Sequence, residues 1–210
     1  MDFASALKDK VIALPHPITY TSIASTPSDT DPNRALRIAF VGHCSADKGF
    51  DLFIELANEF AGPDLEFWAI GRESEALPEQ ALEKLTHRPT KGYLSSEEYY
   101  EALAGTDIVL LPLAEQYRYV ASGSVLDAIS ALKPIITIEN STYRAIADEY
   151  GSFGPMLENR GAIHALFASL DEERFLPQKE MWLKALLAIR SARAPEKLAI
   201  KYAKAVLTSR

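Results

Sequence analysis

Two segments of the sequence place glycine beside residues that can hold an anion, each directly after an apolar run. In the first, the run from Ile38 ends at Gly42 and is followed by His43 and Lys48. This pattern predicts a strand that turns through glycine into a helix start, where free N–H groups and the helix dipole bind anions. The spacing fits neither the nucleotide P-loop nor the dinucleotide-binding turn. The candidate catalytic residues are Lys48 and His43, and an ordinary turn with a solvated lysine is the alternative.

The second segment follows an apolar run over residues 108–111. Its small-residue turn, Ser122-Gly123-Ser124, opens a helical pattern, so backbone N–H groups and hydroxyls there can grip phosphate oxygens while the glycine permits close approach. Asp127 lies three residues after Ser124. Two interpretations of Asp127 stay open. It is either a capping-box carboxylate that accepts the Ser124 N–H or an acceptor for two vicinal ribose hydroxyls.

Five runs rich in apolar residues alternate with helical patterns, as in parallel βαβ units, and are the expected strands that position these turns. They are Arg37–Val41, Glu66–Ile70, about Lys91–Leu94, Ile108–Leu111 and Pro134–Ile138. Four of the five are almost continuously apolar, as strands covered on both faces should be. The predicted fold is an α/β, Rossmann-like, doubly wound and mostly parallel sheet of five or six strands with a C-terminal helical extension.

Helical periodicity fills the connections between these strands. It predicts helices over residues 52–60, 124–132 and 142–150, the last ending before Gly151. Ser95 and Glu98 form a capping-box pattern that opens a helix to about Ala104. After residue 161 the pattern is helical to the end, and Pro195 is well placed to start the last helix.

We divide the chain into an entry segment with a polar loop (1–35), a Rossmann-like domain (36–170) and C-terminal helices (171–210). The polar loop contains Asp29-Thr30-Asp31, a spacing found in some metal-dependent sugar transferases. In a stretch so rich in Ser, Thr, Pro and Asp we interpret it as a turn.

Composition excludes several classes of protein. With 48% hydrophobic and 24% charged residues the chain is globular, and its net charge of −7 argues against nucleic-acid binding. The single cysteine, Cys44, excludes an internal disulfide, and the four histidines lack metal-ligand spacing, so no metal is expected. No apolar stretch is long enough to span a membrane and no secretory signal is seen, so the expected location is the cytoplasm.

The order of these motifs resembles the C-terminal, donor-binding domain of retaining glycosyltransferases of the two-domain GT-B fold, in the glycosyl transferases group 1 family. The resemblance runs from about Val11 to Leu170. The motifs that carry it are Leu14-Pro15-His16-Pro17, Val41-Gly42-His43 with Lys48-Gly49, Ala69-Ile70-Gly71, Gly92-Tyr93-Leu94, Thr106 to Pro112, and Asp127-Ala128 with Leu132-Lys133-Pro134.

The resemblance implies a nucleotide-diphosphate-sugar donor, UDP- or GDP-linked, at the carboxyl ends of the strands. Lys48 would contact the donor phosphates, and Asp127, in place of the usual Glu, would hold the ribose. The backbone of 92–94 would border the base, and the turn at 122–124 would meet the diphosphate. The implied donor-binding residues are Gly42, Gly71, Gly92, Tyr93, Leu94, Arg118, Ser122, Gly123, Ser124 and Asp127. The implied reaction is hexosyl transfer with retained configuration, without metal or cofactor, in polysaccharide biosynthesis.

Two departures from the family pattern concern charge. The family's arginine is His43 here, which lacks the guanidinium fork that clamps phosphate. The first of the family's paired carboxylates falls at Tyr119, and Glu115, four residues earlier, is out of register. Arg118 is the residue that we expect to supply the missing positive charge.

The family also carries an N-terminal acceptor-binding domain, whereas these 210 residues contain one expected sheet. We therefore expect the chain to need such a domain or subunit as its partner, to make any peripheral membrane contact through it, and to be inactive alone. A non-catalytic GT-B-like binding module is the rival interpretation, which His43 and Tyr119 favour. A nucleotide-sugar 2-epimerase-like domain ranks third, because it would need carboxylates and a histidine that converge on the sugar.

Overall fold

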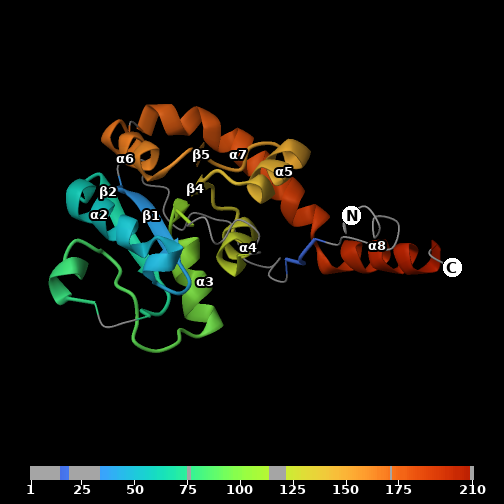
Figure 1. Ribbon diagram of the computed structural model, residues 1–210, viewed down its shortest axis with the longest axis horizontal. Helices are drawn as coiled ribbons and strands as arrows, with labels where there is room; N and C mark the ends of the chain where they lie inside the picture. Colours follow the sequence, from blue (N-terminus) through green and yellow to red (C-terminus); the bar gives the residue numbers. More distant parts are fainter. Residues whose placement is uncertain (1–14, 19–33, 75–76, 114–121, 171, 209–210) are drawn as a thin grey trace, which may run out of the picture.

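Five short strands pair side by side in a sheet that is parallel throughout (Figure 1). The computed structural model describes residues 15–18, 34–74, 77–113, 122–170 and 172–208. The strands are β1 (Leu36–Val41), β2 (Leu65–Ile70), β3 (Ile108–Leu111), β4 (Ile135–Ile138) and β5 (Met156–Leu157), in the order β2-β1-β3-β4-β5. The predicted α/β fold with a parallel sheet of five or six strands is confirmed.

One predicted strand is wrong. Residues 91–94 form no strand. A few residues earlier the backbone forms isolated bridges, of His87 with Trp68 in β2 and of Thr90 with Arg72 just after β2. Tyr93 is 85% exposed, so the apolar pair at 93–94 does not enter the sheet as a buried strand would. The fifth place in the sheet belongs to β5, which the sequence analysis missed because two residues carry no readable periodicity.

Helices begin and end close to their predicted positions. They are α2 (Phe50–Phe60), α3 (Ser96–Ala104), α4 (Gly123–Ser130), α5 (Ser141–Tyr150), α6 (Arg160–Ala168), α7 (Glu172–Ala192) and α8 (Pro195–Thr208), with single 3₁₀ turns η1 (Ala46–Lys48) and η2 (Glu79–Leu82). The capping box of α3 is confirmed, because the Ser95 hydroxyl accepts the Glu98 N–H at 3.2 Å and the Glu98 carboxylate accepts the Ser95 N–H at 2.8 Å.

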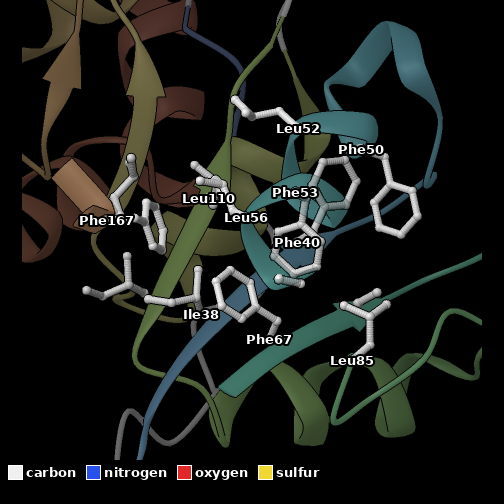
Figure 2. Packing of buried hydrophobic residues seen from close by; sticks show 14 of the residues in the cluster. Ile38, Phe40, Phe50, Leu52, Phe53, Leu56, Phe67, Leu85, Leu110 and Phe167 are labelled. Carbon is white, nitrogen blue, oxygen red and sulfur yellow. The ribbon is translucent and has the colours of Figure 1, made fainter. Parts of the chain in front are cut away.

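Apolar side chains leave both faces of the sheet and are covered on each side by helices, which is the doubly wound arrangement. Alternate residues of β1 face opposite ways. Phe40 packs with Phe53 of α2 and Phe67 of β2 on one face (Figure 2). Val41 belongs to the cluster on the other face, with residues of α4 and α7. Ala185, Leu186 and Ile189 of α7 pack in this same cluster. The apolar residues of the last helix were predicted to be packing surface too, but Ile200, Tyr202 and Val206 are exposed.

Ionic contacts close the amino ends of the strands. Arg34, before β1, forms a bidentate pair with Asp107, before β3, at 2.6 and 2.7 Å. The buried Lys133 ammonium, before β4, donates to the carbonyl oxygens of Ala104 and Thr106 at 2.7 and 2.6 Å. Burial pushes the pKa of Asp107 upward, but hydrogen bonds from Arg34 and the Arg37 N–H outweigh it and leave that pKa below its usual value. The candidate site lies at the opposite edge, at the carboxyl ends of β1 and β2.

The last helix, α8, extends away from the body of the sheet (Figure 1). Within the described residues, no helix is both long enough and apolar enough to cross a membrane.

Candidate functional site

The two turns singled out in the sequence meet at the carboxyl end of β1. The Ser124 hydroxyl, at the start of α4, donates to the Val41 carbonyl oxygen at 2.9 Å. Gly42 follows directly with a φ of +95°, and a Cβ placed on it would lie 2.6 Å from the Ser124 Oγ. Only glycine fits a backbone that is both left-handed and this close to its neighbour. The first turn therefore packs against the helix start of the second.

A second contact joins the same two segments. Gly49, with a φ of +83°, separates the η1 turn from α2, and a Cβ on it would lie 2.5 Å from the Pro112 carbonyl oxygen. Lys48 lies at the end of η1 and is half-buried. The helix start that the sequence predicts after Gly42 is thus a 3₁₀ turn followed by α2, and Lys48 lies just before α2.

A cavity of about 430 Å³ opens at the carboxyl ends of β1 and β2. Its described lining consists of Gly42, His43, Gly71, Arg72, Tyr93, Leu94, Ser95, Ser96, Tyr99 and Tyr100. The size falls in the range of small-molecule sites, and the mix of aromatic side chains with a few polar groups is typical of them. Gly71 allows the backbones after β1 and β2 to approach closely beside this cavity, because a Cβ on it would lie 1.9 Å from the Gly42 carbonyl oxygen.

Five predicted site residues line this cavity: Gly42, His43, Gly71, Tyr93 and Leu94. Ser124 adjoins it through Val41 and Gly42. Lys48, Gly92, Ser122, Gly123 and Asp127 are described but are not part of its lining. Arg118, together with Tyr119, Glu115 and Asp29-Thr30-Asp31, lies outside the described residues.

Asp127 is held by two tyrosines that line the cavity. Its Oδ2 accepts the Tyr99 hydroxyl at 3.0 Å and its Oδ1 accepts the Tyr100 hydroxyl at 3.1 Å. The capping-box interpretation of Asp127 is wrong, because the helix begins after Ser122 and the carboxylate points to α3 instead of the first turn of α4. Each carboxylate oxygen keeps a second lone pair for a further donor.

Electrostatics around Asp127 follow from its burial. Burial raises the pKa of Asp127, and the hydrogen bonds from Tyr99 and Tyr100 offset part of that rise. Burial and the nearby Asp127 carboxylate raise the pKa of Tyr99 well above its ordinary value, so Tyr99 keeps its proton and remains a hydrogen-bond donor. Next to the cavity, burial raises the pKa of Cys44 to about 12, so the thiolate that would act as a nucleophile does not form.

Sequence analysis missed five residues of the lining: Arg72, Ser95, Ser96, Tyr99 and Tyr100. Arg72 follows Gly71 directly, and its guanidinium carbon lies 4.5 Å from the centroid of the Tyr93 ring. A polar residue just past a strand-end glycine was a usable signal, since open α/β sheets bind ligands at that edge. The two tyrosines had no comparable signal, because only the packing of α3 against β2 brings them to the edge.

Comparisons with known proteins support the fold. The sequence matches no protein-family model and no curated protein. Among solved structures, the chain is similar to TarM (15% identity, TM-score 0.56, 88% of this chain and 37% of TarM) and to the GtfA/B complex (10% identity, TM-score 0.57, 85% of this chain and 37% of that chain).

It is also similar to the C-terminal domain of a glycosyl transferase group 1 family protein, LpcC, from Francisella tularensis. The identity is 17%, the TM-score 0.51, and the match covers 90% of this chain and 98% of that domain. The chain thus spans about a third of TarM and nearly all of the LpcC domain. At these identities the likeness concerns the fold, and the chain has the fold of the C-terminal domain of GT-B glycosyltransferases.

Proposed function

We propose that this chain is the nucleotide-diphospho-sugar-binding domain of a retaining glycosyltransferase. The observation that carries the proposal is the hydrogen bond from the Ser124 hydroxyl to the Val41 carbonyl, which brings the start of α4 to the strand-end cavity. A donor lying across this edge would place its base and ribose in the cavity and its diphosphate beside the start of α4. The domain division of 36–170 for donor binding, with helices beyond it, is part of the proposal.

The diphosphate would be bound by backbone donors and one lysine. N–H groups in the first turn of α4 have no partner inside the helix, so Gly123 and Ser124 can donate to phosphate oxygens. The half-buried Lys48 would add a full positive charge at the neighbouring turn. Hydrogen bonds to charged groups contribute about 1.5–3 kcal/mol each. Such a set can stabilise the charge that develops on a departing diphosphate, which is how the reaction would proceed without a metal.

Transfer of the sugar would require a second domain that binds the acceptor. The match covers 37% of TarM, and we propose that the acceptor site lies on an N-terminal domain or subunit outside these 210 residues. We propose that the isolated chain binds the donor and transfers no sugar. Roles in polysaccharide biosynthesis and a cytoplasmic location belong to this same proposal.

A non-catalytic binding module on the same fold is the second candidate. One observation favours it: both Asp127 oxygens already accept tyrosine hydroxyls, so a ribose would have to use the remaining lone pairs. The presence of His43 where the family has arginine adds to it. Such a module would keep the cavity and lose the strong diphosphate clamp.

Thermal unfolding of the full chain with UDP, GDP, ADP and their sugars tests the proposal. A ligand bound only by the folded state raises stability by RT ln(1 + [L]/Kd), about 2.7 kcal/mol at a hundred times Kd. We expect a rise in Tm with one nucleotide family and a smaller rise in Lys48→Met. The matched control is Lys184→Met, which removes an exposed lysine on α7. No rise with any of these ligands at millimolar concentration would contradict donor binding and favour the second candidate.

A further inference from the structure

Helix α8 exposes large apolar side chains to solvent. Of the side chains described in this helix, only Leu198 is buried. Ile200 and Tyr202 are each 58% exposed, and Leu207 is 71% exposed. Figure 1 shows that α8 leaves the body of the sheet, so the core described above does not cover these residues. Exposed apolar side chains gathered on one helix mark an interaction surface.

The charged side chains of α8 are mostly lysines, and the lysines lie on one stripe of the helix. Lys197, Lys201 and Lys204 have the i, i+4, i+7 spacing that places side chains on one face. The Lys197 ammonium donates to the Ser191 hydroxyl at 2.6 Å, a neutral partner that leaves its charge uncompensated. With Glu196 as the one acid in its sequence, α8 has a net charge of +2 in a chain whose net charge is −7.

Apolar side chains flank this lysine stripe on both sides. At about 3.6 residues per turn, Ile200 and Leu207 lie on one side of the stripe, and Leu198 and Tyr202 lie on the other. A lysine can lay its aliphatic stem along apolar surface while its ammonium reaches a polar layer. Ammonium groups between two apolar stripes therefore match a surface that is negatively charged outside and apolar beneath, as an anionic bilayer is.

The length and the charge of α8 decide between the possible occupants of this surface. Its 14 residues span about 21 Å, whereas the hydrocarbon core of a bilayer is about 30 Å thick, so the helix can lie on a membrane and cannot cross it. A second copy of the chain matches less well, because two α8 helices packed together would bring two lysine stripes close to each other.

We propose that α8 is an interfacial helix that binds the anionic surface of a membrane. Its apolar stripes enter the headgroup region, and the ammonium groups of Lys197, Lys201 and Lys204 contact the negative charges of the lipids. Membrane contact is then a property of this chain itself and does not need the N-terminal half. The inference is independent of donor binding, because the described lining of the cavity contains no residue of α8.

Co-sedimentation of the full chain with lipid vesicles, in the absence of nucleotide, tests this inference. One set of vesicles is phosphatidylcholine alone, and the other contains about 30% phosphatidylglycerol, which is anionic. At low salt we expect the chain to bind the anionic vesicles at least about tenfold more tightly than the neutral ones. Most of that preference should disappear at about 0.5 M salt, because the ions screen the lysines from the lipid charge.

Two sets of substitutions in α8 separate the effect of charge from that of apolar surface. Lys197→Gln/Lys201→Gln/Lys204→Gln should remove the preference for anionic vesicles, because each lysine near such a surface contributes about fivefold to binding and the acidic remainder of the chain opposes it. Ile200→Gln/Leu207→Gln keeps every charge and should weaken binding to the anionic vesicles about tenfold or more.

Matched controls remove the same kinds of side chain from other elements. Lys84→Gln/Lys91→Gln/Lys184→Gln removes three exposed lysines outside α8. Leu183→Gln/Leu187→Gln removes two exposed leucines of α7. Both control variants should bind the anionic vesicles as the parent chain does. Tm values of all variants, measured without lipid, show whether each is folded.

Three results would overturn the inference. If the folded parent chain binds neither kind of vesicle, the occupant of α8 is a protein surface, such as the proposed N-terminal half. If the parent chain binds neutral and anionic vesicles equally, or if the control variants lose as much binding as the α8 variants, the lysine stripe of α8 is not the membrane contact. We expect sedimentation velocity without lipid to show a monomer. A dimer that Ile200→Gln/Leu207→Gln converts to a monomer would make a second copy the occupant.

Discussion

The side chain of Ser124 and the main chain of Val41, 83 residues apart in sequence, are joined by a buried hydrogen bond of 2.9 Å. Val41 ends β1 and Ser124 lies in the first turn of α4, so the bond connects the two turns that the sequence marks as anion sites. Because parallel strands present their carboxyl ends at one edge, the fold brings such turns together, and this bond fixes how closely they approach.

Ser124 and Gly42 should be energetically coupled. Ser124→Ala loses the bond to Val41 and should cost about 1 kcal/mol. Gly42→Ala places a Cβ 2.6 Å from the Ser124 Oγ at a φ of +95° and should cost about 1–3 kcal/mol. In the double variant the Oγ is gone and the Ser124 Cβ lies at 3.9 Å, so the clash is relieved. In urea unfolding, the double variant should lose at least about 0.5 kcal/mol less stability than the two single variants lose together. If the two losses simply add, the contact between Ser124 and Gly42 is contradicted.

Gly71 and Gly92 form a matched pair of glycines beside the cavity. A Cβ on Gly71 would lie 1.9 Å from the Gly42 carbonyl oxygen, a backbone atom that cannot move away as a flexible side chain could. Gly71→Ala should therefore lower the free energy of unfolding by about 3 kcal/mol or more. A Cβ on Gly92 meets no atom within 4 Å, so Gly92→Ala should change it by less than about 0.5 kcal/mol. Equal effects in urea unfolding would show that the β1 and β2 ends do not approach as described.

Local signals account for the parts of the fold that could be predicted. The β3 run and all of β1 except Arg37 are buried, and the Ser95 capping box marks the start of α3 within one residue. The failure at 91–94 has a different cause, since Tyr93 is apolar and yet 85% exposed. An aromatic residue of a cavity wall and one of a buried strand look alike in a sequence, and only the packing of the chain separates them.

The candidate site was predictable where one strand end carries it and not where distant elements share it. Gly42 and His43 follow directly from the end of β1. The partners of Asp127 could not be predicted, because Tyr99 and Tyr100 are 28 and 27 residues away on another helix. From the sequence alone, a carboxylate three residues after a serine predicts a capping box equally well.

Lys133 should make stability rise with pH in the alkaline range. Burial lowers its pKa to about 8, while Asp107 opposes that shift. In the unfolded chain the pKa is about 10.4, so between these values the unfolded state binds more protons and stability increases with pH. Urea unfolding at several pH values from 8 to 10 should show the parent chain gaining stability relative to Lys133→Met. If the stability difference between the parent chain and Lys133→Met stays constant or shrinks as the pH rises, the burial of a charged ammonium is contradicted.

His43 should respond to replacement by the family's arginine. It lines the cavity and is half-buried, and a guanidinium there would add a full charge and a fork of donors for phosphate. His43→Arg should tighten pyrophosphate binding about tenfold, equivalent to about 1.4 kcal/mol, in titration calorimetry. His16→Arg adds the same charge at an exposed position and should have no such effect. Unchanged affinity in His43→Arg would remove this position from the phosphate site.

Asp127 should contribute to ligand binding at a cost in stability. Its pKa is raised by burial, so the folded state binds more protons than the unfolded state just above the ordinary value of about 3.9, and stability falls as pH rises there. Asp127→Asn keeps an oxygen for one tyrosine and offers its amide to the other. Urea unfolding from pH 4 to 7 should show the parent chain losing stability relative to Asp127→Asn, which we expect to be equally or more stable at pH 7.

Nucleotide affinity distinguishes a ribose ligand from a structural carboxylate at this position. If Asp127 accepts ribose hydroxyls, Asp127→Asn should weaken the nucleotide that the parent chain binds best by about tenfold, because the charged acceptor is lost. The matched ligand is the 2′,3′-dideoxy form of the same nucleotide, which lacks both hydroxyls and should bind the two proteins equally. A loss of stability of more than about 1 kcal/mol with unchanged nucleotide affinity would make Asp127 an anchor for Tyr99 and Tyr100 alone, since the tyrosine hydroxyls would then account for its whole role.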